Sequence, residues 1–298
     1  MHQFKRNRRL RVNESIRSLV RENHISENDF IVPLFIVDGK GIKEEILSMP
    51  NYFRYSLDTL KNEIKELWGL GLKSVLLFVK VDDKLKDNYG KEAINPDGLM
   101  QRAVMTIKST CPDMLIMTDV ALDPYSIHGH DGVVEHGEII NDKTIEILSQ
   151  MSVSHAKAGA DFIAPSDMMD GRILCIRKAL EKSGFINTGI MSYSAKYASS
   201  FYGPFRDALN SAPINNQNIP FDKKTYQMDY SNRLEALKET KMDIEEGADI
   251  VMIKPGLAYL DIIRDIKNKF NVPIATYQVS GEYSMIKAAS EKGWLDYN

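Results

Sequence analysis

Short apolar runs alternate with amphipathic helical stretches along most of this chain, and this alternation limits its fold more than any other feature. Seven such runs occur, at residues 30–37, 74–79, 114–122, 161–166, 187–194, 249–254 and 273–280. Near-continuous apolar strands between amphipathic helices indicate parallel strands that are covered on both faces. Over 298 residues, this rhythm favours an α/β fold of the (β/α)8 TIM-barrel type over a short open sheet.

Two further patterns bear on this interpretation. The phrases KAGAD at 157–161 and EEGAD at 245–249 each lead into a strand, and their glycines predict helices that end in a left-handed C-cap. A doubly wound sheet is an alternative, but residues 37–45 lack the G-x-G-x-x-G turn that such folds place after the first strand. Because only seven units can be counted, we expect a barrel that stops after the seventh βα unit.

Residues 1–29 precede the rhythm and are polar and basic, with a helical patch near 15–20. We predict an N-terminal arm over 1–29, followed by a catalytic barrel domain over 30–298. The arginines of the arm either form a solvated charge run or contact another subunit.

The composition excludes several classes of partner. A net charge of −3 gives no electrostatic reason to bind nucleic acid or an anionic membrane. The basic N-terminus lacks the apolar segment of a secretory signal, and the apolar runs fall short of the roughly 20 residues that span a bilayer. Cys111 and Cys175 are isolated in the sequence, which fits a reducing cytosol, so we expect a cytoplasmic protein.

Two lysines follow strands in this pattern. Lys254 closes the run IVMIK, and Lys196 follows GIMSYSA. An ammonium group at the end of a buried strand loses hydration, which lowers its pKa, and a second ammonium nearby lowers it further. A neutral lysine can attack a carbonyl carbon and form a Schiff base, so two such lysines suggest two carbonyl substrates. The alternative is that both amines extend to solvent at the rim of the sheet.

Other polar residues follow the same strands. They are Asp119, Asp123, Ser166, Asp167 and Ser280. In a barrel, catalytic groups gather at the carboxyl ends of the strands, so we expect carboxylates and hydroxyls close to the two lysines. Such a set suits imine chemistry, in which carboxylates and water transfer protons.

The segment TDVALDPYSIHGHDG at 118–132 brings two histidines near two aspartates. Imidazole and carboxylate are both metal ligands, so His128, His130, Asp123 and Asp131 form one candidate metal site. The alternative is a polar loop whose histidines bond to the backbone. The lack of cysteine in the segment argues against a tight zinc site.

Residues 203–228 are rich in Pro and Asn and show no periodicity. Loops of this length in a compact domain are usually functional lids or disordered. Arg206 and Lys223 on this segment could hold a substrate carboxylate, the arginine through two bonds. The alternative is that both are solvated surface charges.

Taken together, these stretches resemble the 5-aminolevulinate dehydratase family, whose members are also called porphobilinogen synthases. The matching segments are RRLR, IVPLFIV, MP-x-x-x-R-Y-S, TDVALDPYSIHGHDG, IAPSDMMDGRI, IMSYSAKYASSFYGPFRDA, YQMD, EGADIVMIKPGLAYLDI and ATYQVSGEYSMIKAA. They extend from about residue 8 to residue 297. The block around Lys196 is highly specific to that family, whereas the barrel rhythm is not.

The resemblance implies a lyase of tetrapyrrole and haem biosynthesis. Two molecules of 5-aminolevulinate would condense to the pyrrole porphobilinogen with loss of two waters. Lys254 would form the Schiff base with the substrate that supplies the propionate side. Lys196 would bind the second keto group.

The resemblance also implies roles for the groups around the lysines. Arg206 and Lys223, on the lid, would hold one substrate carboxylate, and Ser280 would hold the other. Asp119 would assist at the amine or in proton transfer. Closure of the lid would exclude water from imines that otherwise hydrolyse.

Metal use differs among members of this family. Those that bind catalytic zinc carry three cysteines in the 118–132 segment, and here the three positions are Ala121, Asp123 and Asp131. Oxygen ligands do not favour zinc, so the chain resembles members without these cysteines, which use magnesium or no active-site metal. Such members often carry an activating magnesium whose protein ligand matches Glu239. From the helical pattern alone, Glu239 is one more charge on a solvated face.

The family is usually a homo-octamer in which an N-terminal arm embraces a neighbouring subunit, and residues 1–29 match such an arm. Magnesium near a subunit boundary would then stabilise the active assembly, which is an allosteric effect. Family members continue with a further helix, an eighth strand and a tail, and the eighth strand supplies a tyrosine for the carboxylate at Ser280. Because these are missing here, a truncated, inactive homologue that acts only as an assembly subunit is one alternative. A class I aldolase-like lyase, which is also a barrel with a Schiff-base lysine, is another.

Overall fold

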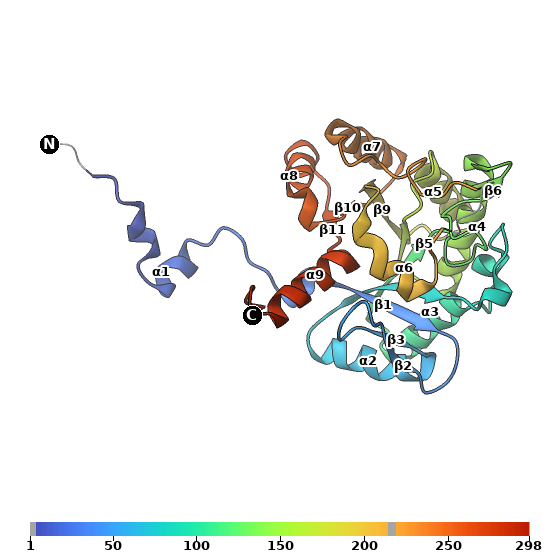
Figure 1. Cartoon of the computed structure of the whole chain (residues 1–298), viewed down its shortest axis with the longest axis horizontal. Coiled ribbons are helices and arrows are strands. Elements are labelled where there is room, and N and C mark those ends of the chain that lie inside the picture. The colour runs from blue at the N-terminus through green and yellow to red at the C-terminus, as the bar shows by residue number, and fades with distance from the viewer. Residues whose placement is uncertain (1–3, 214–218, 298) are drawn as a thin grey trace.

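The computed structural model describes residues 4–213 and 219–297. Residues 1–3 of the predicted arm, 214–218 of the predicted lid and 298 of the predicted barrel domain lie outside the described residues. The centre of the molecule is a sheet whose strands alternate along the chain with the helices that surround it (Figure 1).

Seven strands of this sheet run parallel and are neighbours in chain order. They are β1 (Ile31–Val37), β4 (Ser74–Lys80), β5 (Leu115–Val120), β8 (Phe162–Pro165), β9 (Gly189–Lys196), β10 (Ile250–Lys254) and β11 (Ile274–Thr276). The helices that connect or follow them are α2 (Leu57–Gly69), α3 (Leu99–Thr110), α4 (Asn141–Ala158), α5 (Arg172–Lys182), α7 (Arg233–Glu246), α8 (Leu260–Lys269) and α9 (Ser280–Glu291). The predicted α/β fold with parallel strands is therefore confirmed.

The two edges of the sheet differ. β11 forms one edge, and a short hairpin of β2 (Lys43–Glu45) and β3 (Phe53–Tyr55) lies beyond β1 at the other. Within the described residues β11 and β1 are not paired, so the strands do not close into a ring. The seven parallel strands agree with the seven predicted units, whereas the expectation that the chain stops short of a complete barrel stays a prediction.

Several short elements were not predicted from the sequence pattern. Besides the β2–β3 hairpin they are β6 (Val134–Glu135), β7 (Glu138–Ile139) and 3-10 turns at Asn7–Arg11, Glu27–Asp29, Asp83–Leu85, Lys91–Ile94, Ser200–Tyr202 and Leu257–Tyr259. The stretch 203–228, predicted to be irregular, begins with a helix, α6 (Gly203–Leu209), so that prediction is wrong there. Pro204 suits the first turn of this helix, and Asn210 ends it in a left-handed conformation with φ of 51°.

The two predicted helix-stop turns are confirmed. Gly159 after α4 and Gly247 after α7 adopt left-handed conformations with φ of 107° and 109°, which a side chain would disfavour. Two residues later, Asp161 and Asp249 each accept a backbone N–H of a neighbouring strand at 2.7 Å. The turns therefore fix where β8 and β10 begin, and so which residues reach their carboxyl ends.

The core consists of apolar side chains on both faces of the sheet. The helices cover one face, and a second cluster centred on Phe35, Phe78 and Met191 fills the other. The rings of Phe35 and Phe78 stack with their centres 5.6 Å apart. Burying each such side chain contributes roughly 1.5–3 kcal/mol, so the strand ends rest on a well-packed base. Among the described residues, no helix combines the length and the apolar character needed to cross a bilayer.

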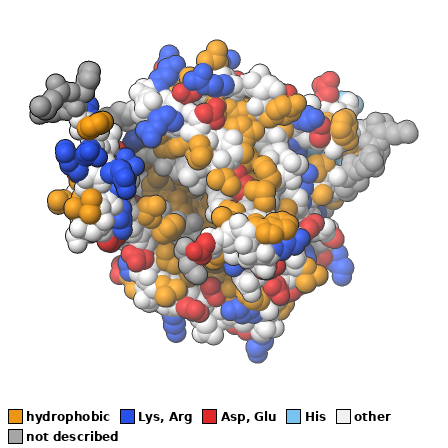
Figure 2. Space-filling model, turned by 60° about the vertical axis from the view of Figure 1, so that its left-hand side comes forward, with side chains coloured by type: hydrophobic (Ala, Val, Ile, Leu, Met, Phe, Trp, Pro, Cys, Tyr) orange, Lys and Arg blue, Asp and Glu red, His pale blue; other side chains and the backbone are white. Residues whose placement is uncertain are grey.

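The predicted helical patch of the arm is α1 (Glu14–Leu19). Figure 1 shows this segment standing away from the body, and the side chains of Leu10, Val12 and Leu19 are exposed. Basic side chains of the arm are visible at the left of Figure 2. The division into an arm over 1–29 and a barrel over 30–298 stays a prediction.

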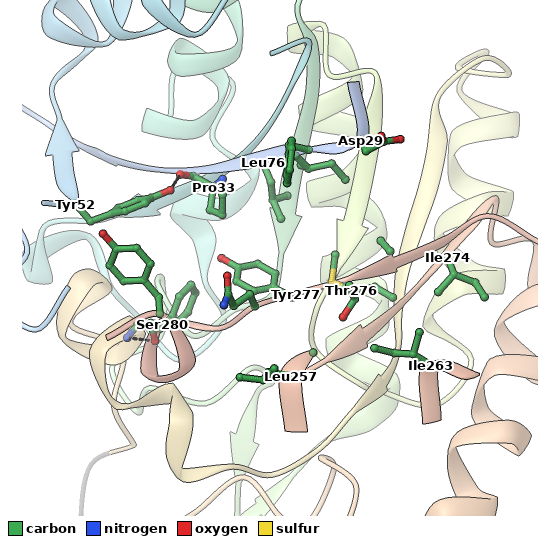
Figure 3. Close-up of a pocket in the computed structure, with 18 of the residues that line it drawn as sticks. Asp29, Pro33, Tyr52, Leu76, Leu257, Ile263, Ile274, Thr276, Tyr277 and Ser280 are labelled. Atoms are coloured by element: carbon green, nitrogen blue, oxygen red, sulfur yellow. Dashed lines mark hydrogen bonds between the residues drawn. The ribbon is translucent and has the colours of Figure 1, made fainter. Parts of the chain in front are cut away.

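A pocket of about 570 Å³ lies between β1 and β11, which do not pair with each other in the described residues. Its walls are mainly apolar, and the base of the arm reaches the pocket at Asp29, which is labelled in Figure 3. Figure 3 shows Tyr277 and Ser280, which follow β11, together with Tyr52, whose hydroxyl donates to the carbonyl of Pro33. Asp29 is the one charged residue among the described residues that line this pocket, so the pocket offers few groups for acid–base chemistry.

Candidate active site

Lys196 and Lys254 lie side by side at the carboxyl ends of β9 and β10. Their Cα atoms are partners in the parallel register of the two strands, and the residues are 6% and 4% exposed. The sequence prediction that both lysines are buried neighbours is confirmed. The alternative that both amines extend to solvent is wrong.

Lys254 ends in an aromatic environment. Four rings, which we call the aromatic wall, surround its Nζ atom. They belong to Tyr193, Tyr202, Phe205 and Tyr277, with centres 5.0, 5.4, 4.8 and 4.6 Å away. Among the described residues, Nζ makes no hydrogen bond or ion pair. Burial, and then the neighbouring ammonium of Lys196, lower the pKa of Lys254 to about 7, as the sequence predicted for this lysine.

Lys196 ends among oxygen atoms. Its Nζ lies 3.3 Å from Oδ2 of Asp131 and donates to the carbonyl of Ser166. Asp131 also accepts from Nζ of Lys223 at 2.6 Å, so one buried carboxylate joins two amines. Burial alone would raise the pKa of Asp131, but the two ammonium groups outweigh it and lower that pKa to about 2.

Asp119, from the end of β5, is placed to transfer protons. Its Oδ1 is buried and has no hydrogen-bond partner among the described residues. Burial, followed by repulsion from Asp123, raises the pKa of Asp119 to about 7. A carboxyl group with that pKa can both give and take a proton near neutral pH.

Asp167 does not join this group, although the sequence placed it at the same strand ends. Its carboxylate turns toward the buried guanidinium of Arg172, at 3.7 Å, and accepts from the backbone N–H of Met169 at 2.7 Å. Both residues lie just beyond the end of β8, and of the two it is Ser166, through its backbone carbonyl, that contacts Lys196.

The groups that face the two lysines enclose a cavity of only about 20 Å³. It is lined by Asp119, Asp123, Ser166, Lys196, Tyr202, Phe205, Arg206, Lys223, Gln227 and Lys254. Such a space holds about one water molecule. A keto acid can therefore enter only when some of these side chains move apart.

The predicted lid closes this cavity. Lys223 is buried and contacts Asp123 at 3.3 Å as well as Asp131. Burial acts to lower the pKa of Lys223, but the two carboxylates outweigh it, so the pKa is raised. His130 bonds to two further lid groups, the Tyr226 hydroxyl at 3.0 Å and the Pro220 carbonyl at 2.7 Å.

The candidate metal site in the 118–132 segment does not form in this arrangement. His130 binds the lid, whereas Asp131 binds the two lysines. Over residues 4–213 and 219–297, no group of three or more His, Cys, Asp or Glu side chains is placed to hold a metal ion. The alternative prediction, a histidine that bonds to the backbone, holds for His130.

Arg206 lines the cavity from α6, and among the described residues its guanidinium makes no hydrogen bond or ion pair. Ser280 does not share this cavity, contrary to the expectation that it belongs with the strand-end groups. Its Oγ accepts from the backbone N–H of Phe205 at 2.9 Å and faces the larger pocket of Figure 3. Phe205 lines both spaces, so α6 separates them.

Glu239 lies on α7 in a third pocket of about 670 Å³, which it shares with Asp170, Asp229 and Glu235. Burial, and then repulsion from Asp243, raise its pKa. A half-buried carboxyl group among other acids gains from a bound cation. The prediction of a plain solvated charge therefore describes Glu239 poorly.

Comparison with known proteins decides the family. The family model described as "Delta-aminolevulinic acid dehydratase" matches residues 4–298. The chain belongs to the delta-aminolevulinic acid dehydratase family. Relatives of that name are 50% identical in Bacillus subtilis (strain 168) and 53% identical in Methanothermus sociabilis. Each alignment spans 98% of this chain, and 88% and 89% of the relative.

A solved structure of the delta-aminolevulinic acid dehydratase family has the same fold. It is the enzyme of Toxoplasma gondii ME49 in complex with the reaction product porphobilinogen, with a TM-score of 0.95 and 49% identity. The match covers 99% of this chain and 83% of that one. The family resemblance predicted from the motifs is confirmed.

Within this delta-aminolevulinic acid dehydratase chain, sequence reasoning missed the aromatic wall. A buried parallel strand is apolar on both faces, so nothing in the run IMSYSAK marks Tyr193 as a neighbour of either amine. The sequence likewise gives no sign that Tyr277 lies near an amine. Tyrosines near a strand that ends in lysine are only a weak sequence signal for such a wall. The register of β9, β10 and β11 is what brings these rings around the amine.

Proposed function

We propose that this protein condenses two molecules of 5-aminolevulinate into porphobilinogen with loss of two waters. The observation that carries the proposal is the pair of buried lysines on adjacent strands, one of them enclosed by the aromatic wall. The family match supports it, as does the solved relative in complex with porphobilinogen. The reaction class is a hydro-lyase with two Schiff bases.

Lys254 is the first nucleophile in this scheme. Because its pKa is about 7, a large fraction is neutral at neutral pH and can attack the keto carbon of one substrate. Loss of water gives an imine, which draws electrons from the adjacent carbon and acidifies it. Asp119, with an unpartnered oxygen in the same cavity, moves the protons. Lys196 forms the second imine after Asp131 releases it.

Arg206 and Lys223 hold one substrate carboxylate in this scheme. Among the described residues the guanidinium of Arg206 has no hydrogen bond or ion pair, so it can form a bidentate contact, whereas Lys223 is already held by Asp123 and Asp131. The substrate carboxylate therefore competes with two aspartates for Lys223, and this exchange opens the lid. Ser280 donates to the second carboxylate after its hydroxyl releases the carbonyl of Phe201, at 3.3 Å, while its Oγ still accepts from the N–H of Phe205.

The experiment that tests this proposal traps the imine. The protein is mixed with 5-aminolevulinate and borohydride, and the modified peptide is identified by mass spectrometry. We expect a covalent adduct on Lys254 and, without borohydride, a pyrrole product that gives a colour reaction. A folded sample that gives neither the adduct nor the pyrrole product would contradict the proposal.

Two alternatives are distinguished by related measurements. A class I aldolase-like lyase needs one imine, so intact activity in Lys196→Met would favour it over the two-imine scheme. An inactive assembly subunit would form a soluble oligomer without turnover, even with magnesium, which size-exclusion chromatography and the pyrrole assay measure together.

We further propose that the chain is of the magnesium-using type, without catalytic zinc. The support is that Ala121, Asp123 and Asp131 replace the cysteines of the zinc-binding members, and that both aspartates contact Lys223. The two cysteines of the chain, Cys111 and Cys175, lie elsewhere as free thiols. Metal analysis of the purified active protein tests this, and a stoichiometric zinc that is required for turnover would contradict it.

Glu239 is the residue we propose to hold an activating magnesium. Magnesium keeps most of its waters, so one carboxylate with acidic neighbours fits its preference. Gln227 lines both this pocket and the lysine cavity, and the N–H of Met228 donates to the carbonyl of Lys196 at 3.0 Å. We expect Glu239→Gln to abolish activation by magnesium, while Glu245→Gln, an exposed residue of the same helix, keeps it.

We also propose a cytoplasmic homo-octamer that is built through the arm. The support is the exposure of apolar side chains on the arm, among them Leu19 at 85%. Mass photometry tests it: Leu19→Asp should dissociate the assembly, and Leu47→Asp, a 92% exposed position on the body, should not. Magnesium should shift the distribution toward the larger species if the activation is allosteric.

The family resemblance implies an eighth strand, and we propose that the working enzyme has a strand between β11 and β1. The support is that β11 pairs only with β10 among the described residues and that an apolar pocket lies beside it, because unpaired edges are normally covered. Hydrogen exchange of the β11 amides in active protein tests this. Fast exchange in fully active protein would contradict it.

A further inference from the structure

The short helix α6 carries two groups of the candidate site. Phe205 contributes a ring of the aromatic wall, 4.8 Å from Nζ of Lys254. The same ring meets Phe78 edge-on at 5.1 Å. The next residue, Arg206, lines the lysine cavity. The position of α6 therefore decides how well Lys254 is shielded and where the guanidinium points.

A helix of seven residues cannot hold itself in place. Its last carbonyl groups have no partner within the helix, and isolated helices of this length are unstable in water. Two of these carbonyls, those of Asp207 and Ala208, accept hydrogen bonds from one side chain. Arg54 donates to them from Nη2 at 2.8 Å and from Nε at 2.6 Å.

Arg54 comes from β3, about 150 residues earlier in the chain, and is 7% exposed. Its third nitrogen, Nη1, pairs with Glu44 at 3.2 Å across the β2–β3 hairpin. A guanidinium at the C-terminal end also matches the negative end of the helix dipole. The rigid fork of arginine makes two bonds at once, which lysine cannot do.

The other end of α6 is held from a different element. Ser280, at the start of α9, accepts from the N–H of Phe205. Because Oγ is the acceptor in this bond, the bond can persist when the hydroxyl donates to a substrate carboxylate. Arg54 holds the far end of α6. The segment MP-x-x-x-R-Y-S, which contains Arg54, has no role in the reaction scheme above.

We propose that Arg54 is a positioning residue that holds α6 so that Phe205 shields Lys254 and Arg206 faces the substrate cavity. This inference rests on the proposed function. Without the clamp α6 moves away from the lysines and water reaches the amine. Because the pKa of Lys254 is lowered first by burial, added water moves its reactivity to higher pH. The other titratable groups facing this amine are Lys196, Asp119, Asp123, Asp131, Arg206, Tyr193, Tyr202 and Tyr277.

The test compares Arg54→Met and Arg54→Lys with matched variants of Arg177. Arg177 also donates to backbone carbonyls, those of Gly247 at 2.9 Å and Thr188 at 3.0 Å. It lies at the amino ends of β9 and β10, away from the reacting groups. Loss of either arginine costs packing and hydrogen bonds, but only loss of Arg54 should change the chemistry.

Two readouts are taken on folded protein across a range of pH. The first is imine trapping with 5-aminolevulinate and borohydride, together with kcat and KM. The second is labelling of Lys254 by acetic anhydride, which needs no substrate and reports how much of the amine is neutral. In the Arg54 variants we expect both pH profiles to move to higher pH and kcat/KM to fall about tenfold or more, with Arg54→Lys between wild type and Arg54→Met. The Arg177 variants should lose thermal stability but keep the wild-type profiles.

Unchanged profiles in folded Arg54→Lys would overturn the inference, and so would an equal shift in the Arg177 variants. If Arg54→Met does not fold, the pH profiles of Arg54→Lys test the inference. If the wild type traps no keto acid yet its labelling profile differs from that of Arg54→Lys, the proposed function fails and the positioning role stands.

Discussion

Lys196 and Lys254 are partners on adjacent strands, but their surroundings are opposite in kind. Lys196 contacts a carboxylate and a backbone carbonyl, whereas Lys254 is enclosed by the aromatic wall. A nearby carboxylate favours the ammonium form of an amine, and exclusion of water favours the neutral form. We infer that the two lysines have different roles: Lys254 is ready to attack a carbonyl, whereas Lys196 reacts only after Asp131 releases it.

Replacing each lysine with methionine tests this contrast most severely. We expect both variants to lower kcat by at least about a thousandfold, because each removes one imine. Their stabilities should differ. Lys254→Met removes a buried amine that has no ion pair among the described residues and should keep or raise the thermal midpoint. Lys196→Met takes an ion-pair partner from buried Asp131 and should lower it. Calorimetry measures the thermal midpoints, and equal shifts in the two variants would contradict the proposed difference between the two lysines.

The carboxylate on the Lys196 side should carry the next largest effect. Asp131→Asn leaves two buried amines short of their common partner, so we expect a loss of about 3 kcal/mol in the free energy of unfolding. Asp222→Asn is the control, since Asp222 pairs with Lys224 in a more exposed ion pair at 3.7 Å and should cost less than about 0.5 kcal/mol. Urea unfolding compares the two variants. Similar losses in the free energy of unfolding would show that Asp131 contributes no more to stability than an exposed ion pair does.

The acid limb of the stability curve tests the same carboxylate. The pKa of Asp131 is about 2 when folded, below its ordinary value of 3.8, so the unfolded chain binds this proton more readily. The stabilisation is therefore present above about pH 4 and is lost as pH falls toward 2. Wild type should lose stability more steeply than Asp131→Asn in that range. Parallel curves would argue against the ion pairs.

The Lys254 side should respond to pH near neutrality. Imine trapping should rise as pH passes through about 7, because only the neutral amine attacks. The carboxylate of Asp119 acts to raise the pKa of Lys254, so Asp119→Asn should move this rise to lower pH. Trapping measured at a series of pH values checks the direction, and a move to higher pH would contradict it.

The smallest effect is expected for a single ring of the aromatic wall. Tyr277→Leu admits some water, which favours the charged amine, but it also removes a cation–π contact worth about 0.5–2 kcal/mol, which had favoured the same form. Because the two changes oppose each other, we expect trapping to change only a few-fold. Tyr259→Leu serves as the control, because the Tyr259 ring stacks on Tyr197 and is not one of the four rings of the aromatic wall.

Much of the fold could be predicted because parallel strands with helices between them carry a strong local pattern. The helix-stop glycines at 159 and 247 are an example, since a left-handed cap is a property of a few adjacent residues. The irregular interpretation of 203–228 was wrong at α6 because a seven-residue helix is held by distant partners rather than by its own sequence. The β2–β3 hairpin was missed because its strands are only three residues long.

The sequence by itself determined that two lysines end consecutive parallel strands, and consecutive strands of this type are neighbours, so the amines had to meet. Only the tertiary structure decided what each amine touches. Asp131 reaches Lys196 across 65 residues and Arg54 reaches α6 across 154, while the Ser280 hydroxyl turned toward a backbone N–H. Such pairings depend on loop paths and side-chain directions, which short-range sequence patterns do not encode, and they set the charge and the hydration of the site.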